Sequence, residues 1–231
     1  MHAVNPEDVL VDVVALSRRM CPHPIEGRLA YATRENFLGR PVAGYRPDAQ
    51  EICLLTRKTA CELCRVQNAL IPRGLGLFIF DAYRPLRAVR DFAAWFPEPP
   101  ASDYEKERKK IHYPHLQKTD LVAAGYAPST VSPHCYGNTV DLSLIYLDSK
   151  KHLNMGTVFD FFDTSSHTDA KAEIIGEEAI HNRQLLLEVM QQFGFVPYQN
   201  EWWHFEYQER EVDYQMDLEI TCELEGMGID K

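Results

Sequence analysis

The chain has 231 residues, of which 45% are hydrophobic and 25% are charged, and its formal net charge is −10. This length and composition predict one soluble globular domain over residues 1–231, with a single hydrophobic core. The negative charge argues against nucleic acid or an anionic membrane surface as a partner, and no apolar run is long enough to span a bilayer. The sequence is compatible with a homo-oligomer and does not determine the oligomeric state.

The amino terminus and the cysteines predict a cytoplasmic protein. Residues 1–8 lack the basic start and the apolar stretch of a signal peptide. The six cysteines are therefore expected to be free thiols in a reducing compartment. Cys61 and Cys64 form a Cys-x-x-Cys pair, a spacing also found in redox and metal sites. No second such pair accompanies them, and the helical pattern around them favours packing on the inner face of a helix.

The first half of the chain predicts alternating strands and helices. Pro72 and Gly74 end the first long helical pattern, and an apolar run follows at once. The expected elements are an early strand at 9–14, an extended segment at 31–33, a helix at 57–71, a buried strand at 75–80, a helix from 85 to about 95, and a surface excursion at 97–110.

The second half predicts further strands around one long helix. An alternating run that begins at Asp141 is typical of a strand, and the apolar spacing over 172–193 predicts a helix that ends at Gly194. The last core strands are expected at 196–197 and 202–207. These elements predict an α+β fold, with helices packed against a mainly antiparallel central sheet.

Three residues from distant parts of the chain could bind one metal ion. His134 and Asp141 lie close together in the sequence, and His204 lies far downstream. Two histidines and one aspartate can hold a zinc ion with one coordination position open, as in catalytic zinc sites. A straight strand would point His134 and Asp141 to opposite faces, so the turn signal at Gly137-Asn138 is needed to bring them together.

Glu201 is a candidate general base, because it lies three residues before His204. A regular strand would again separate the two side chains, so Glu201 is expected at the strand entrance and His204 within the strand. The alternative is that these histidines are ordinary core residues, as a lone histidine beside aromatic residues usually is. The combination of both motifs favours a small zinc hydrolase with one ion per chain.

These motifs resemble the D-alanyl-D-alanine dipeptidases of the vancomycin-resistance type, a zinc-dependent branch of peptidase family M15. The family pattern Ser-x-His-x-x-Gly-x-x-x-Asp matches residues 132–141, and Glu-Trp-Trp-His matches 201–204. The resemblance extends from about residue 9 to about residue 207. Four further stretches are similar to the same family, namely 31–39, 81–85, 155–160 and 182–186.

The resemblance implies the fold of the D-Ala-D-Ala metallopeptidases, also called hedgehog-like, and hydrolysis of D-alanyl-D-alanine to two D-alanines. It implies zinc held by His134, Asp141 and His204, with Glu201 as general base. Such an activity removes the dipeptide that ends peptidoglycan precursors, or recycles it as a nutrient. Two alternatives remain: a zinc D,D-carboxypeptidase or endopeptidase acting on larger peptidoglycan peptides, and a non-catalytic binding module of the same fold.

Arg84 is a second catalytic candidate. An arginine that follows an apolar strand can point into a cleft, or it can form an ion pair with a carboxylate such as Asp81. The resemblance favours the cleft, where a guanidinium stabilises the oxyanion that forms as water attacks.

The resemblance also implies substrate-binding residues. Asp160 is expected to receive the free ammonium group of the substrate, although a loop or cap aspartate is the alternative and Asp163 lies close by. Ser132 and Tyr31 are expected to border the substrate. Cys135 stands where small polar residues are common in the family, so the wall of the pocket and the substrate preference are expected to differ from those of the family.

Overall fold

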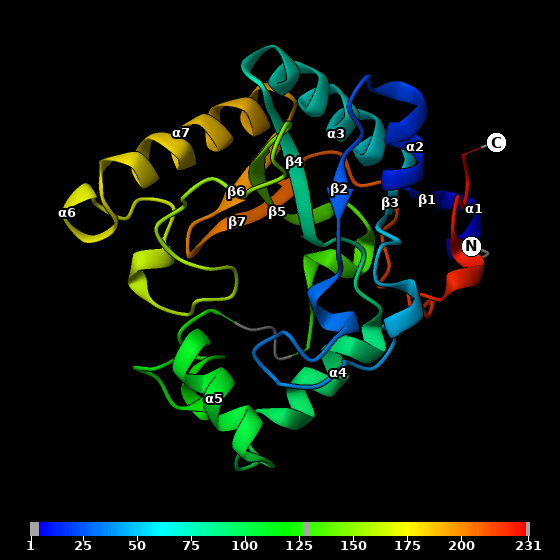
Figure 1. Ribbon diagram of the computed structural model, residues 1–231. Coiled ribbons are helices and arrows are strands. Elements are labelled where there is room, and N and C mark those ends of the chain that lie inside the picture. Colours follow the sequence, from blue (N-terminus) through cyan, green and yellow to red (C-terminus); the bar gives the residue numbers. More distant parts are fainter. Residues whose placement is uncertain (1–4, 127–129, 230–231) are drawn as a thin grey trace.

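The computed structural model describes residues 5–126 and 130–229 (Figure 1). The chain also contains short 3-10 turns, among them η1 (Ala30–Ala32), η5 (Pro133–Tyr136) and η6 (Thr164–Ser166). The helices and strands follow one another along the chain as α1 (Pro6–Val9), β1 (Leu10–Asp12), α2 (Val13–Met20), β2 (Glu26–Gly27), β3 (Leu54–Thr56), α3 (Arg57–Leu70), β4 (Leu75–Asp81), α4 (Leu86–Trp95), α5 (Asp103–His112), β5 (Thr139–Tyr146), α6 (Ala172–Ile175), α7 (Glu177–Gln192), β6 (Phe195–Tyr198) and β7 (Glu201–Tyr207).

The main sheet has five strands in the order β2-β4-β5-β7-β6, and β1 and β3 form a separate two-stranded sheet. The pair β2-β4 is parallel, and the other pairs are antiparallel. This arrangement confirms the predicted α+β class with a mainly antiparallel sheet. Helices α3 and α7 lie on one side of the sheet, at the top of Figure 1, whereas α4 and α5 lie below it.

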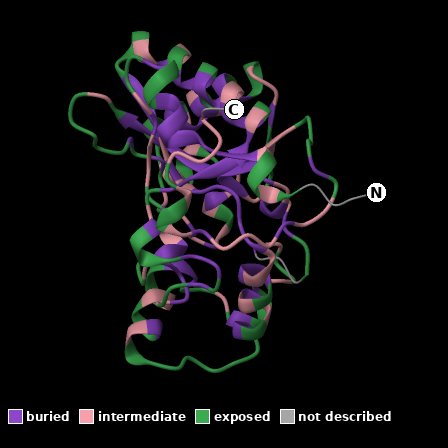
Figure 2. Ribbon diagram, turned by 90° about the vertical axis from the view of Figure 1, so that its right-hand side faces the viewer, coloured by how far each residue is buried: buried purple, intermediate pink, exposed green. Residues whose placement is uncertain are grey.

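Buried hydrophobic side chains form one connected cluster within the described part of the chain. Figure 2 shows buried residues gathered in the sheet and the adjacent helices, with exposed residues on the outer loops. Among the largest fully buried side chains are Trp203 on β7, Tyr83 after β4 and Phe162. Each such side chain stabilises the fold by about 2–3 kcal/mol through burial. None of the helices in the described ranges is both long and apolar enough to cross a membrane.

A row of polar residues crosses three adjacent strands of the main sheet. Asp81 on β4 lies opposite Asp141 on β5, and Asp141 lies opposite His204 on β7. The register of β4 against β5 shifts between Ile79 and Asp81, which is a β-bulge. Because a one-residue shift moves the following side chains to the other face of the sheet, the bulge at Phe80 places Asp81 on the face that carries Asp141.

Helix α3 has the position and length that the sequence predicts, and Gly74 ends the following turn in the left-handed region with φ +71°. Its inner face buries Cys64, while Cys61 is half-buried. Both are free thiols. Packing therefore accounts for the Cys-x-x-Cys pair.

Two expected elements in the first part of the chain are wrong. The early strand ends at Asp12, because the Asp12 carboxylate accepts hydrogen bonds from the backbone N–H groups of Val14 and Ala15 and so begins α2. The segment 31–33, expected to be extended, lies mostly in the 3-10 turn η1.

Two further differences lie downstream. The expected surface excursion at 97–110 contains most of α5, whose first turn is capped by the Ser102 hydroxyl accepting from the backbone N–H of Glu105. The expected helix over 172–193 is broken into α6 and α7 at Gly176, whose φ of +85° is incompatible with a continuous helix.

Candidate metal centre and its pocket

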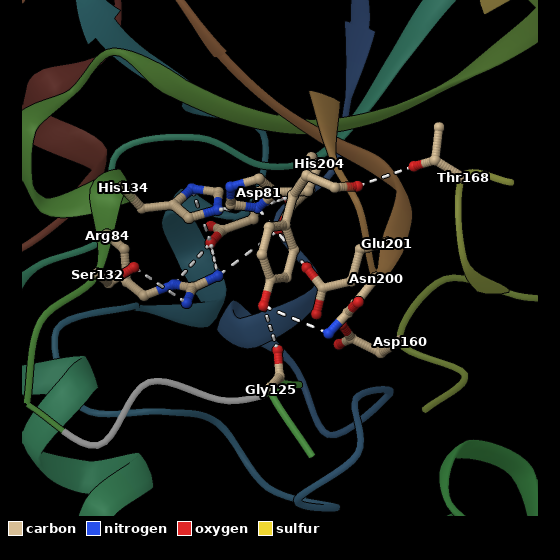
Figure 3. A network of polar contacts seen from close by, with 12 residues as sticks. Asp81, Arg84, Gly125, Ser132, His134, Asp160, Thr168, Asn200, Glu201 and His204 are labelled. Atoms are coloured by element: carbon tan, nitrogen blue, oxygen red, sulfur yellow. Dashed lines mark hydrogen bonds and ion pairs between the residues drawn. The ribbon is translucent and has the colours of Figure 1, made fainter. Parts of the chain in front are cut away.

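His134, Asp141 and His204 form a compact cluster of potential metal ligands. Figure 3 shows the side chains of His134 and His204 next to each other. Their ligand atoms all lie within 4.8 Å of one another. Asp141 Oδ1 is 3.3 Å from His134 Nε2 and 3.0 Å from His204 Nδ1. The two histidine nitrogens are themselves 3.3 Å apart. His134 and Asp141 are buried, and the His204 side chain is 13% exposed, so the cluster faces a cavity.

The fold explains why these side chains meet. Asp141 and His204 are register partners on β5 and β7. His134 lies on the turn η5, which ends at Gly137 with φ +73°. The left-handed conformation favours glycine at this position, and a Cβ atom there would lie 2.8 Å from Leu10 Cδ2, so a larger residue would also force the buried neighbours to shift. The expected turn thus brings His134 back over the strand that carries Asp141.

The donor set fits a zinc ion. His134 Nδ1 donates a hydrogen bond to the carbonyl oxygen of Ala82 at 2.7 Å, which leaves the Nε2 lone pair directed at the cluster. Among the described residues Asp141 Oδ1 is buried yet has no hydrogen-bond partner. Two imidazole nitrogens and an unsatisfied carboxylate oxygen are ligands that zinc accepts, and a cation between them would satisfy this oxygen.

The protonation states also suit a cation. Burial by itself raises the pKa of Asp141, but His134 and His204 hold it well below its usual range. Burial lowers the pKa of His204, although Asp141 opposes this shift. The carboxylate is therefore ionised and the imidazole neutral near pH 7, and these are the metal-binding forms.

Glu201 reaches the same cavity from the first position of β7. Its Oε2 is 3.7 Å from His204 Nδ1. The register of β7 against β6 shifts between the pairs Pro197–Phe205 and Tyr198–Glu201, and this irregularity lets Glu201 and His204 face one side despite their odd spacing. Burial raises the pKa of Glu201 well above its usual value, and the nearby carboxylate of Asp141 adds to the shift.

Arg84 satisfies both interpretations of its sequence position, because it forms an ion pair and also lines the cavity. Its guanidinium is buried and contacts Asp81 Oδ2, with Nε donating at 3.0 Å and NH2 at 2.9 Å. NH2 is also 3.6 Å from Asp141 Oδ2, and NH1 donates to Ser132 Oγ at 3.5 Å. The hydroxyl of Tyr45 donates to the other oxygen of Asp81 at 2.8 Å. These contacts fix the guanidinium beside the metal ligands.

Asp160 is buried on the opposite side of the cavity. Its Oδ2 accepts a hydrogen bond from the hydroxyl of Tyr31 at 3.0 Å. Burial raises the pKa of Asp160 well above its usual value, and the charge of Asp141 acts in the same direction. Asp163, in contrast, accepts from the backbone N–H of Ser165 and caps η6.

The loop that carries Asp160 is tied to α7 by Arg183. The Arg183 guanidinium donates to the carbonyl oxygens of Met155, Ser165 and His167, at 2.7, 3.0 and 3.0 Å. These acceptors carry no formal charge, so Arg183 holds the backbone of the loop rather than an acid. Residues 182–186 belong to a motif of the resemblance, so the signal for Arg183 was present although its role was not apparent.

One cavity of about 280 Å³ brings all the predicted site residues together. Arg84 and Ser132 lie on one side of it, and Glu201 and Asp160 lie on the other (Figure 3). Several other residues that line the cavity were not predicted as site residues, although Phe37 and Pro133 lie within motifs of the resemblance. These lining residues are Phe37, Phe92, Gly125, Tyr126, Val131, Pro133 and Tyr198. The Tyr198 hydroxyl donates to the Gly125 carbonyl oxygen at 2.8 Å, which joins β6 to the 121–126 turn at the rim. Cys135 is buried and does not line this cavity.

Comparison with known proteins gives a consistent result. A family described as peptidase M15, D-Ala-D-Ala dipeptidase, matches residues 14–220. A D-alanyl-D-alanine dipeptidase of Enterococcus faecalis is 36% identical over 183 residues, which cover 79% of this chain and 86% of the relative. A protein of the same name from Streptomyces coelicolor is 36% identical and covers 76% of this chain and 82% of the relative. Another from Escherichia coli is 31% identical and covers 79% of this chain and 78% of the relative.

Solved structures with some similarity include VanYB in complex with D-alanine-D-alanine, with a TM-score of 0.40 and 16% identity. The similar region covers 68% of this chain and 74% of that chain.

Proposed function

The chain belongs to the D-Ala-D-Ala dipeptidase family of the M15 peptidases, and from this membership we propose that it is a zinc enzyme that hydrolyses D-alanyl-D-alanine to two D-alanines. One observation carries the proposal. A single cavity of about 280 Å³ is lined by a His-Asp-His cluster, a buried glutamate, a buried arginine and a second buried aspartate. The volume is at the small end for ligand pockets, as a dipeptide requires.

His134, Asp141 and His204 would hold the zinc ion, through the atoms that already face one another. A zinc ion bound there supplies a Lewis acid, which lowers the pKa of its water and polarises the peptide carbonyl. Ala82 fixes the ring of His134 by accepting its Nδ1–H, and Asp81 lies 3.7 Å from the same nitrogen. Such outer contacts keep the coordinating nitrogen pointed at the site.

Glu201 acts as the general base. It accepts a proton from water as the water oxygen bonds to the peptide carbonyl carbon. It then delivers a proton to the amine nitrogen as the carbon–nitrogen bond breaks. Burial and the neighbouring carboxylates raise its pKa, which makes Glu201 a stronger base than an exposed glutamate.

Arg84 stabilises the negative charge that develops on the carbonyl oxygen. Asp81 and Tyr45 hold its guanidinium in place before the substrate binds. A donor that is already oriented needs little reorganisation when charge develops in the transition state, so the interaction favours turnover more than binding.

Asp160 and Tyr31 recognise the substrate amino terminus. Asp160 is buried and ionisable, and an ammonium group beside it would supply the opposite charge that burial otherwise leaves missing. Ser132 borders the same cavity and contacts Arg84. This arrangement supports cleavage of free dipeptides and rejection of N-acylated ones.

The proposal is tested by zinc content together with hydrolysis of D-alanyl-D-alanine and N-acetyl-D-alanyl-D-alanine by the purified protein. We expect about one zinc per chain and efficient release of D-alanine from the free dipeptide only. Efficient release from the acetylated dipeptide or from muropeptides would assign the chain to a carboxypeptidase activity instead. Zinc binding without hydrolysis of either substrate would indicate a non-catalytic binding module.

A further inference from the structure

Asp160 has a backbone conformation that few residues adopt. Its φ is +57°, in the left-handed region, and the residue is not a glycine. Aspartate tolerates this region better than most residues, but a buried one remains there only when neighbouring contacts hold it. The direction of the Asp160 carboxylate therefore depends on whatever fixes the backbone around it.

His112 makes the contacts that fix this backbone. It is the last residue of α5 and is buried, with 4% exposure. His112 Nδ1 lies 3.0 Å from the carbonyl oxygen of Asp160. The backbone carbonyl oxygen of His112 accepts a hydrogen bond from the N–H of Phe162 at 2.6 Å. The end of α5 thus binds the loop both at Asp160 and just after it.

The neighbours of the His112 ring determine which nitrogen carries the proton. Arg108 NH2 is 2.7 Å from His112 Nε2, and a guanidinium can only donate. Nε2 is therefore the acceptor, and Nδ1 carries the hydrogen that is donated to Asp160. Arg108 is itself held by the Asn36 carbonyl oxygen at 2.8 Å and by Glu35 at 3.3 Å. Burial and the charge of Arg108 lower the pKa of His112 to about 4, so the ring is neutral near pH 7.

We propose that His112 is a positioning residue for substrate recognition, and that its Nδ1–H holds the Asp160 backbone so that the carboxylate meets the substrate ammonium group. The inference rests on the proposed function, in which Asp160 binds that group. Tyr31 holds one carboxylate oxygen from inside the cavity, and His112 holds the backbone from behind. His112 does not line the cavity itself, so it acts through Asp160.

Two substitutions of His112 separate this role from simple packing. Asparagine places an amide N–H near the position of Nδ1, and glutamine places an amide near the position of Nε2. His112→Asn is therefore expected to keep the hydrogen bond to Asp160 and lose the contact with Arg108. His112→Gln is expected to do the reverse.

The test measures equilibrium binding in a Glu201→Gln background, loaded with zinc, where the ligand is not consumed. The probes are D-alanyl-D-alanine and N-propionyl-D-alanine, which lacks only the ammonium group. We expect His112→Gln to weaken D-alanyl-D-alanine binding roughly fivefold to tenfold, the worth of a typical hydrogen bond, and to leave N-propionyl-D-alanine binding unchanged. His112→Asn should bind both probes within about twofold of the parent.

Equal weakening of both probes, or no weakening in His112→Gln, would overturn the positioning role. Asp160→Asn in the same background distinguishes the two proposals. If it weakens the two probes equally, the ammonium role of Asp160 fails, and the role of His112 fails with it. If Asp160→Asn weakens only D-alanyl-D-alanine binding, but His112→Asn and His112→Gln bind that probe equally well, the role of Asp160 stands and the positioning role of His112 fails.

The unmodified protein gives an independent check, because nitrogen-15 shifts of His112 should report a proton on Nδ1 and none on Nε2. The opposite tautomer would contradict the proposal.

Discussion

Asp141 on β5 lies directly opposite His204 on β7, and Asp141 Oδ1 is 3.0 Å from His204 Nδ1. The strand register alone therefore brings together two of the three candidate metal ligands. Side chains directly opposite each other on antiparallel strands have Cβ atoms only about 4.5–5.5 Å apart. A slip of either strand by one residue would separate them, so the site depends on the same register as the core.

Removal of a ligand should remove the metal. His204→Ala is expected to lower zinc affinity roughly 100-fold or more, because even an outer partner of a ligand is typically worth about 10–100-fold. Metal content after dialysis, measured by mass spectrometry, checks this. The double variant Cys61→Ala, Cys64→Ala is the control and should keep its zinc. Loss of zinc from the cysteine variant, with retention in His204→Ala, would move the metal site to α3.

Replacement of the general base should separate metal binding from turnover. Glu201→Gln keeps the size of the side chain and removes its basicity, so zinc content and fold should remain. The rate of D-alanyl-D-alanine hydrolysis should fall by about 10²–10⁴-fold, as expected for loss of a general base. Steady-state kinetics of the zinc-loaded variant measure this effect. Turnover within a few fold of the parent would exclude Glu201 from the role.

The two nearby aspartates should behave differently. Asp160→Asn is expected to impair hydrolysis of the free dipeptide by raising its KM, because the charge opposite the ammonium group is lost. Asp163→Asn is the matched control, since Asp163 caps η6 and does not line the cavity. Asp163→Asn should affect only the free energy of unfolding, which should fall by up to about 1 kcal/mol because the cap is weakened. Similar KM values for Asp163→Asn and Asp160→Asn would argue against the assignment.

His112 should make folding stability depend on pH. Burial lowers its pKa to about 4 from the usual 6.5, so between these values the unfolded chain binds a proton that the folded protein does not. The free energy of unfolding is therefore unaffected by this group above pH 6.5 and decreases as the pH falls toward 4. The total decrease is about 3 kcal/mol. Urea unfolding at pH 7 and pH 4.5 measures it. His112→Asn should show less acid destabilisation than the parent, because asparagine does not titrate, and equal losses would contradict the prediction.

Two glycines in the same backbone conformation offer a test of the turn that carries His134. Gly74 and Gly137 have φ values of +71° and +73°, but only Gly137 has neighbours within 4 Å of an added Cβ. Gly74→Ala should therefore cost only the backbone strain, about 1–2 kcal/mol. Gly137→Ala should cost more, because Leu10 or the turn must move, and it should weaken zinc binding as well. Thermal unfolding and metal content measure the two effects, and equal behaviour of the two variants would contradict the argument.

The sequence was most informative where periodicity and local motifs coincide. The apolar runs predict β4, β5 and β7 because these strands are buried and short, and three of the predicted metal and base residues lie on two of them, Asp141 on β5 and Glu201 and His204 on β7. The turn at Gly137 was visible because glycine marks it. The register that sets Asp141 against His204 is a long-range property, and it required the structure.

Helix α5 was missed because its surface is almost entirely charged and offers little apolar periodicity. A weaker signal was present, since Ser102 followed three residues later by Glu105 is the spacing of an N-terminal cap. The contact between His112 and Asp160 had no local signal, because 48 residues separate them. Contacts of this kind come from tertiary packing and leave no pattern in a single sequence.

The buried groups around Arg84 also set a charge balance for the cavity. The carboxyl groups of Asp81, Asp141, Asp160 and Glu201 are buried around one buried guanidinium. With all four ionised, three negative charges remain uncompensated, and burial accordingly raises the pKa values of Asp81, Asp160 and Glu201. A divalent cation offsets part of this negative charge. A free dipeptide also brings its own carboxylate, so its ammonium group compensates Asp160 locally and does not change the net charge of the cavity, which depends on the metal and on protonation of the buried carboxyl groups.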